Sequence, residues 1–146
     1  MKFNRSTHFY IATNIMDSVF TKTQPLEYEK WVDFIDSNQN EFIWYEKTKS
    51  GMEAFENIDK VPEDFKERVI ASLKKVSCFK EYDNKKGYCN INCSFNSTNN
   101  RISIGFERTP KLEDLKIFVE MAKYLDALLL KDGTEIIDEK MIEGLT

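Results

Sequence analysis

The most regular pattern of apolar and polar residues lies between residues 77 and 108. In the stretch 87–95 every second side chain is apolar, and the side chains between are polar. The apolar set is Cys89, Ile91, Cys93 and Phe95. A period of two is typical of a strand with one buried face. The run 101–108 repeats the pattern, so we predict a three-stranded antiparallel meander over 77–82, 87–95 and 101–108.

Four other segments have the composition of strands. Residues 7–14 and 41–48 are rich in aromatic and β-branched residues. The turn signal Lys49-Ser50-Gly51 follows the second of these, so we read 52–58 as its return strand. A short last strand is expected over 134–138.

Helical spacing occurs in three stretches. We predict Pro25 as the first residue of one helix, because the apolar residues that follow it recur every three or four positions up to Ile35. Pro62 opens a second helix, with Glu63 and Asp64 in the first turn, where the helix dipole favours acids. Thr109-Pro110 starts a third helix that we expect to run to about Lys131, with Gly133 as its C-terminal cap.

The predicted order is β-α-β-β-α-β-β-β-α-β. Strands outnumber helices and several are joined by tight turns, which favours the α+β class. We therefore expect a single two-layer domain over residues 1–146. Its mostly antiparallel sheet would have about five to six strands, with three amphipathic helices packed on it.

The strand predicted at 41–48 is apolar on both sides. Phe42 and Trp44 point one way and Ile43 and Tyr45 the other. Such a strand is either a central strand of a sheet that is covered on both faces, or a strand that offers one face to a partner. Tryptophan is enriched in interfaces, so Trp44 is a candidate contact residue, and a homodimer would use the same surface.

Composition narrows the class of protein. The chain has 146 residues, of which 41% are hydrophobic and 13% aromatic, enough for one packed core and too many for a disordered chain. No apolar run reaches the roughly 18 residues of a membrane helix. The apolar stretch Phe9 to Ala12 is too short for a secretory signal, so we expect a cytoplasmic protein.

Catalytic and metal-binding patterns are absent from the sequence. The three cysteines, Cys78, Cys89 and Cys93, read as reduced thiols, although a disulfide from Cys78 to one of the others stays open. Their spacing does not suit zinc, and the single histidine, His8, is some 70 residues away. Because no phosphate-binding glycine loop occurs either, we assign no catalytic residue, metal or cofactor.

Charge is unevenly distributed. Residues 26–67 carry five basic and twelve acidic side chains, while residues 68–110 carry eight basic and three acidic ones. Residues 111–146 are acidic again, with five basic and nine acidic side chains. An acidic surface attracts a basic protein and speeds its association. The candidate contacts in the first acidic stretch are Asp33, Asp36, Glu41 and Glu46, together with Trp44. Those in the second are Asp132, Glu135, Asp138, Glu139 and Glu143.

These features favour a protein-binding role over an enzymatic one. The leading hypothesis is an inhibitor, such as an immunity protein that neutralises a bacterial nuclease toxin through an acidic surface. The alternative is a small enzyme or ligand-binding domain of unknown substrate. A third reading is a sheet that stacks single-stranded RNA, because aromatic and basic residues interleave around the meander. Those residues are Phe79, Tyr82 and Tyr88 with Lys74, Lys75, Lys80, Lys85, Lys86, Arg101 and Arg108.

Overall fold

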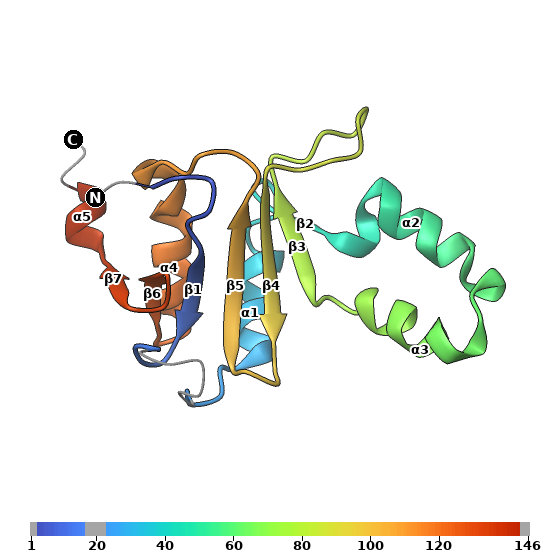
Figure 1. Cartoon of the computed structure of the whole chain (residues 1–146), viewed down its shortest axis with the longest axis horizontal. Helices are drawn as coiled ribbons and strands as arrows, with labels where there is room; N and C mark the ends of the chain where they lie inside the picture. The colour runs from blue at the N-terminus through green and yellow to red at the C-terminus, as the bar shows by residue number, and fades with distance from the viewer. Residues whose placement is uncertain (1–2, 17–22, 144–146) are drawn as a thin grey trace.

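A computed structural model describes residues 3–16 and 23–143, and within them the chain forms seven strands. They are β1 (Phe9–Ala12), β2 (Ile43–Trp44), β3 (Ser77–Lys80), β4 (Ile91–Asn96), β5 (Arg101–Phe106), β6 (Leu128–Lys131) and β7 (Glu135–Ile137). All pair antiparallel in one sheet of order β2-β3-β4-β5-β1-β6-β7 (Figure 1). The α+β class and the antiparallel sheet are therefore confirmed, with slightly more strands than predicted.

Five α-helices accompany the sheet in the described residues. They are α1 (Tyr28–Asp36), α2 (Lys49–Glu56), α3 (Glu63–Ser72), α4 (Lys116–Tyr124) and α5 (Glu139–Glu143). Short 3₁₀ helices precede or follow three of them: η1 (Tyr45–Lys47), η2 (Ile58–Lys60) and η3 (Leu112–Leu115). The first helix begins at Tyr28, three residues later than the Pro25 start that we predicted.

The predicted meander is confirmed as β3-β4-β5. Cys78 lies opposite Cys93, and Cys93 lies opposite Ile104. The first strand, β1, then inserts between β5 and β6, with Phe9 opposite both Ile104 and Lys131. The N-terminal segment therefore occupies an interior position of the sheet rather than an edge.

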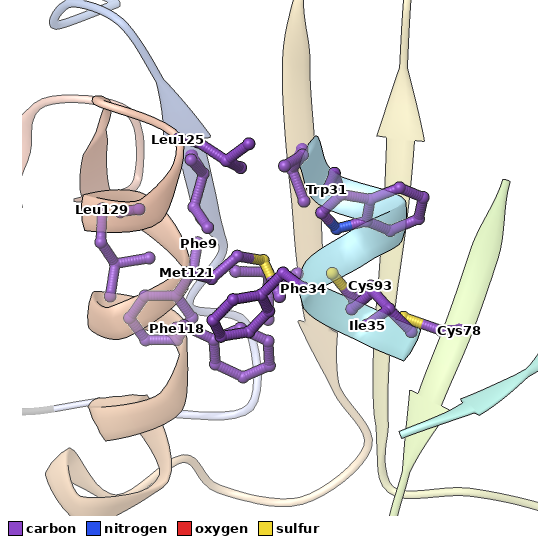
Figure 2. Packing of buried hydrophobic residues seen from close by; sticks show 14 of the residues in the cluster. Phe9, Trp31, Phe34, Ile35, Cys78, Cys93, Phe118, Met121, Leu125 and Leu129 are labelled. Atoms are coloured by element: carbon purple, nitrogen blue, oxygen red, sulfur yellow. The ribbon is translucent and has the colours of Figure 1, made fainter. Parts of the chain in front are cut away.

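The core lies between one face of the sheet and the helices α1 and α4. Phe34 from α1 lies beside Phe118 and Met121 from α4 (Figure 2). Trp31, also from α1, packs toward β4, with its ring centroid 5.5 Å from that of Phe95. All five side chains are buried. Burial of such large rings is the main source of stability for a chain of this length.

Two predicted elements are wrong because a neighbouring signal was misread. Residues 52–58 form no strand: α2 begins after Thr48, whose hydroxyl accepts the N–H of Gly51 at 3.1 Å as a helix cap. The long helix predicted to Lys131 ends at Tyr124, and 128–131 is strand β6. Asp132 and Gly133 have positive φ angles of 53° and 84°, so they form the tight β6–β7 turn instead of a helix cap. The C-terminal helix α5 was not predicted.

The strand at 41–48 is also shorter than expected, and of its two predicted placements the central one is wrong. Only Ile43 and Trp44 are in strand conformation, and β2 lies at the edge of the sheet, not at its centre. Phe42 and Trp44 face the core, while Ile43 and Tyr45 are half-buried on the opposite face.

Between β2 and β3 the chain leaves the sheet. We call residues 45–76, which include η1, α2, η2 and α3, the arm. The two helices of the arm extend beyond the β2–β3 edge and do not cover the sheet (Figure 1). The β6–β7 hairpin and α5 lie at the opposite end of the sheet.

Candidate interaction site

An apolar groove lies between the two helices of the arm. It has a volume of about 780 Å³. Its apolar lining comes from both helices and from η2, and charged groups lie around it. The lining residues are Met52, Phe55, Ile58, Ile70 and Leu73, with Glu46, Glu56 and Lys74.

Side chains of the arm are unusually exposed for their type. Among the groove residues, Phe55 is 68% exposed, Met52 51% and Ile70 39%. Isolated exposed apolar residues are ordinary, but a contiguous group of large ones marks a contact surface. The groove therefore resembles a binding surface and not a part of the hydrophobic core.

Local sequence explains why this apolar face exists. Met52 and Phe55 are three residues apart in α2, and Ile70 in α3 is three residues before Leu73, the C-cap of that helix, so each helix turns a pair of apolar side chains to the groove. The root of α2 is fixed against η1, because a Cβ atom at Gly51 would lie 1.9 Å from the carbonyl oxygen of Tyr45. This close approach sets the direction in which the arm leaves the sheet.

A carboxylate lies at the base of the groove. Oε2 of Glu46 accepts the backbone N–H of Lys75 at 3.1 Å. Its Oε1 atom is buried and has no hydrogen-bond partner among residues 3–16 and 23–143. A buried acceptor without a donor is costly, so positive charge placed near this carboxylate is favourable.

The surface around the groove is acidic. Residues 49–67 carry six acidic and three basic side chains. Lys66 lies 3.9 Å from Asp59 and 3.7 Å from Glu63. Within the described part of the chain no ion pair involves the other four acids, which are Glu53, Glu56, Asp64 and Glu67. This part of the arm therefore has net negative charge.

The first set of predicted contact residues is mostly engaged within the protein. Trp44 is 3% exposed and donates its indole N–H to Asp36 at 2.8 Å. This hydrogen bond is the main reason why the pKa of Asp36 is lowered. Glu41 pairs with Lys80 at 3.2 Å. Asp33 is exposed on α1, and Glu46 is the one member of the set that lines the groove.

The second set lies along the β6–β7 hairpin and α5, at the far end of the sheet from the arm (Figure 1). Asp132 accepts the N–H of His8 at 3.0 Å, and Asp138 accepts the N–H of Met141 at 3.1 Å. Glu135 lies 3.8 Å from Lys131, and Glu139 pairs with Lys123. Glu143 is exposed in α5. The structure thus separates the two predicted acidic sets instead of joining them.

The groove residues Met52 and Phe55 were missed from the sequence, because 52–58 was read as a strand. Their three-residue spacing after a capping threonine was the signal that would have placed them on one helix face.

Reactive chemistry is not gathered at the groove. Within the described ranges no group of three or more His, Cys, Asp or Glu side chains is arranged to hold a metal ion. Burial is the largest cause that raises the pKa of both Cys78 and Cys89, which disfavours the thiolate form that a nucleophile needs. The three thiols are free, so the disulfide left open by the sequence is not formed.

Comparison with known proteins adds no family. No family model, curated protein or solved structure matches the chain. No helix among the described residues is long and apolar enough to cross a membrane.

Proposed function

We propose that this is a non-enzymatic protein-binding protein whose contact element is the arm. The observation that carries the proposal is the exposed apolar groove between α2 and α3, with Phe55 and Met52 at its surface. When a partner covers large apolar side chains that lie together in solvent, the free energy of binding becomes more favourable.

The partner is an amphipathic protein segment with a basic character. Its apolar side chains would fill the groove, in the way that a helix lies in a hydrophobic groove. A lysine or arginine at the groove would lie near the carboxylate of Glu46. Further basic residues would face the acidic surface formed by Glu53, Glu56 and Glu67.

An inhibitor of a basic protein fits this surface. Nuclease toxins present basic surfaces to nucleic acid, and an acidic binding protein competes for the same charge. More specifically, we propose that the protein is an immunity protein that neutralises a bacterial toxin. A cytoplasmic location belongs to it, since three free cysteines suit a reducing compartment.

Site-specific photo-crosslinking in the producing cells tests the proposal. A benzophenone amino acid is placed at Phe55 or, as the control, at Tyr124, which is 48% exposed on α4. We expect the first position alone to capture a distinct basic protein. Phe55→Asp should then weaken its binding by roughly 30-fold or more, the effect of losing a central contact residue.

Three results would contradict the proposal. The Phe55 position captures nothing that the Tyr124 position does not, the captured protein binds the Phe55→Asp variant as tightly as the wild type, or only a second copy of this chain is captured. The last result would identify the groove as a homodimer interface.

A further inference from the structure

A second cavity lies at the root of the arm, on the face of the sheet opposite the core. Its volume is about 560 Å³, within the usual range for a small-molecule site. Four aromatic rings from η1, β3 and the β3–β4 loop line it. They are Tyr45, Phe79, Tyr82 and Tyr88. Phe79, Tyr82 and Tyr88 are the aromatic residues that alternate with basic residues in the sequence, and in the fold Tyr45 lies beside them.

The rings are held in defined positions. Tyr45 and Phe79 pack edge to face, with ring centroids 6.2 Å apart. The hydroxyl of Tyr82 accepts the backbone N–H of Lys49 at 2.7 Å. The loop carrying Tyr88 is closed by a backbone hydrogen bond of 2.9 Å from Asp83 N–H to the Tyr88 carbonyl. Tyr88 is nevertheless 52% exposed, so much of its ring is free for a ligand.

Two lysines, Lys49 and Lys86, lie beside this cavity. The ammonium of Lys86 lies 5.9 Å from the centroid of the Tyr88 ring. Gly87 lines the cavity, and the side chain of Lys49 would lie 3.7 Å from a Cβ atom at that glycine. Neither lysine forms an ion pair within the part of the chain that the structure describes.

Three of the other basic residues around the meander are already paired within the protein. Lys75 pairs with Asp36, Lys80 with Glu41, and Arg108 with both Glu81 and Asp114. Lys49 and Lys86, which form no such pair among the described residues, therefore remain available to an anionic ligand beside the aromatic cavity.

Polar groups complete the site. Arg5, Asn90 and Glu107 line the cavity, and Arg5 donates to the backbone carbonyl of Glu107 at 3.1 Å. Arg5 and Glu107 also line an adjoining cavity of about 320 Å³. An acidic side chain of this kind suits ribose hydroxyls, and an amide suits the edge of a base.

From this arrangement we infer that the aromatic cavity binds a nucleotide. The base stacks on Tyr88 and its neighbouring rings, and the phosphate contacts Lys49 or Lys86. A quaternary ammonium ligand would also suit aromatic rings, but the surrounding cations oppose it. The shared chemistry is that of a free nucleotide or of one residue in a single-stranded nucleic acid. This inference goes beyond the proposed function and does not depend on it.

Titration of the full chain followed by NMR tests the inference, with four ribonucleoside monophosphates, an eight-residue oligonucleotide and inorganic phosphate as probes. We expect nucleotides, but not phosphate alone, to shift the signals of Tyr82 and Tyr88. Tyr88→Ala should weaken binding roughly tenfold, and Tyr124→Ala, an equally exposed tyrosine on α4, should not. Lys86→Gln should weaken binding and flatten its salt dependence, while Lys140→Gln in α5 should change neither.

The affinity of the oligonucleotide relative to the monophosphates distinguishes a single-stranded nucleic acid from a free nucleotide as the ligand. Binding at least 100-fold tighter than that of the monophosphates identifies a single strand, and comparable binding identifies a free nucleotide. Absence of shifts at Tyr82 and Tyr88, equal competition by inorganic phosphate, or wild-type affinity in Tyr88→Ala would overturn the inference.

Discussion

Trp44 donates its indole N–H to the carboxylate of Asp36 at 2.8 Å, and Lys75 contacts the other oxygen of that carboxylate at 3.2 Å. Trp44 immediately precedes the arm, and Lys75 lies near its end. One acid on α1 therefore ties both ends of the arm to the core. The hydroxyl of Tyr28, also on α1, reinforces the second attachment by donating to the carbonyl of Lys75 at 2.9 Å.

Removing this acid should destabilise the protein. Asp36→Ala leaves the buried indole N–H of Trp44 without an acceptor, at a cost of about 1–3 kcal/mol. Asp33→Ala is the matched control, because Asp33 is exposed on the same helix, and it should change stability by less than about 0.5 kcal/mol. Urea unfolding of both variants measures the difference. Equal stabilities would contradict the role assigned to Asp36.

The ion-pair network of Arg108 should make stability depend on pH. Its guanidinium contacts Asp114 at 2.8 Å and Glu81 at 2.6 Å. The hydrogen bond from Arg108 is the main reason why the pKa of Glu81 is lowered. Burial acts to raise the pKa of Asp114, but hydrogen bonds from Arg108 and from the Lys111 N–H outweigh it and lower that pKa. Lowered carboxylate pKa values stabilise the fold above the unfolded pKa of about 4, and this is lost as pH falls through the folded values.

Arg108→Met should therefore be less stable than the wild type at pH 7, by about 1–3 kcal/mol. The difference should shrink as the pH falls below about 4, because the wild type loses the stabilisation that the variant already lacks. Arg68→Met serves as control, since Arg68 is exposed on α3. Unfolding curves between pH 7 and pH 3 give the free energies of unfolding. If the difference between the wild type and Arg108→Met were constant across this range, the ion-pair network would not contribute to the pH dependence of stability.

Gly51 should be required for the direction of the arm. Alanine at this position places its Cβ against the Tyr45 carbonyl, so α2 must shift away from η1. Overpacking of this kind costs about 1–3 kcal/mol. Ser50→Ala, at the exposed neighbouring residue, should be close to neutral. Thermal unfolding and amide exchange in 49–56 provide the measurements. Wild-type exchange in Gly51→Ala would show that the contact does not position α2.

The three thiols should react at different rates. Cys89 is half-buried, whereas Cys78 and Cys93 are buried opposite each other in β3 and β4. Iodoacetamide at pH 8 should modify Cys89 first and Cys78 only on the timescale of unfolding, because burial also raises the pKa of Cys78 strongly. Peptide mapping by mass spectrometry gives the order, and labelling in guanidinium shows that all three can react. Equal rates for Cys78 and Cys89 in the native protein would be inconsistent with this packing.

The sequence predicts the meander well because one face of each strand is buried and the other is polar. Ile102, Ile104 and Phe106 alternate with less buried residues, as the period of two requires. The boundary between α4 and β6 is different. Leu129 and Leu130 are both buried, on opposite faces of the sheet, so an apolar run continues from the helix into the strand. Periodicity cannot divide such a run, although the Asp132-Gly133 pair is a hairpin signal.

The candidate site could be predicted only in part. The acidic character of the first stretch is a property of composition, and it persists on the arm. Which acids remain free depends on tertiary partners: Asp36 and Glu41 are adjacent to cations from distant segments, Lys75 and Lys80. The groove itself depends on how two short helices face one another, which no local pattern specifies.

Hydrogen exchange in the complex shows whether the partner binds at the arm or at the opposite end of the sheet. The chain is mixed with the protein captured at Phe55, and exchange is followed by mass spectrometry in free and bound states. We predict slower exchange in 49–73, the two helices of the arm, and unchanged exchange in 128–143, which carries the second acidic set. Slower exchange in 128–143 with an unprotected arm would contradict the assignment of partner binding to the groove.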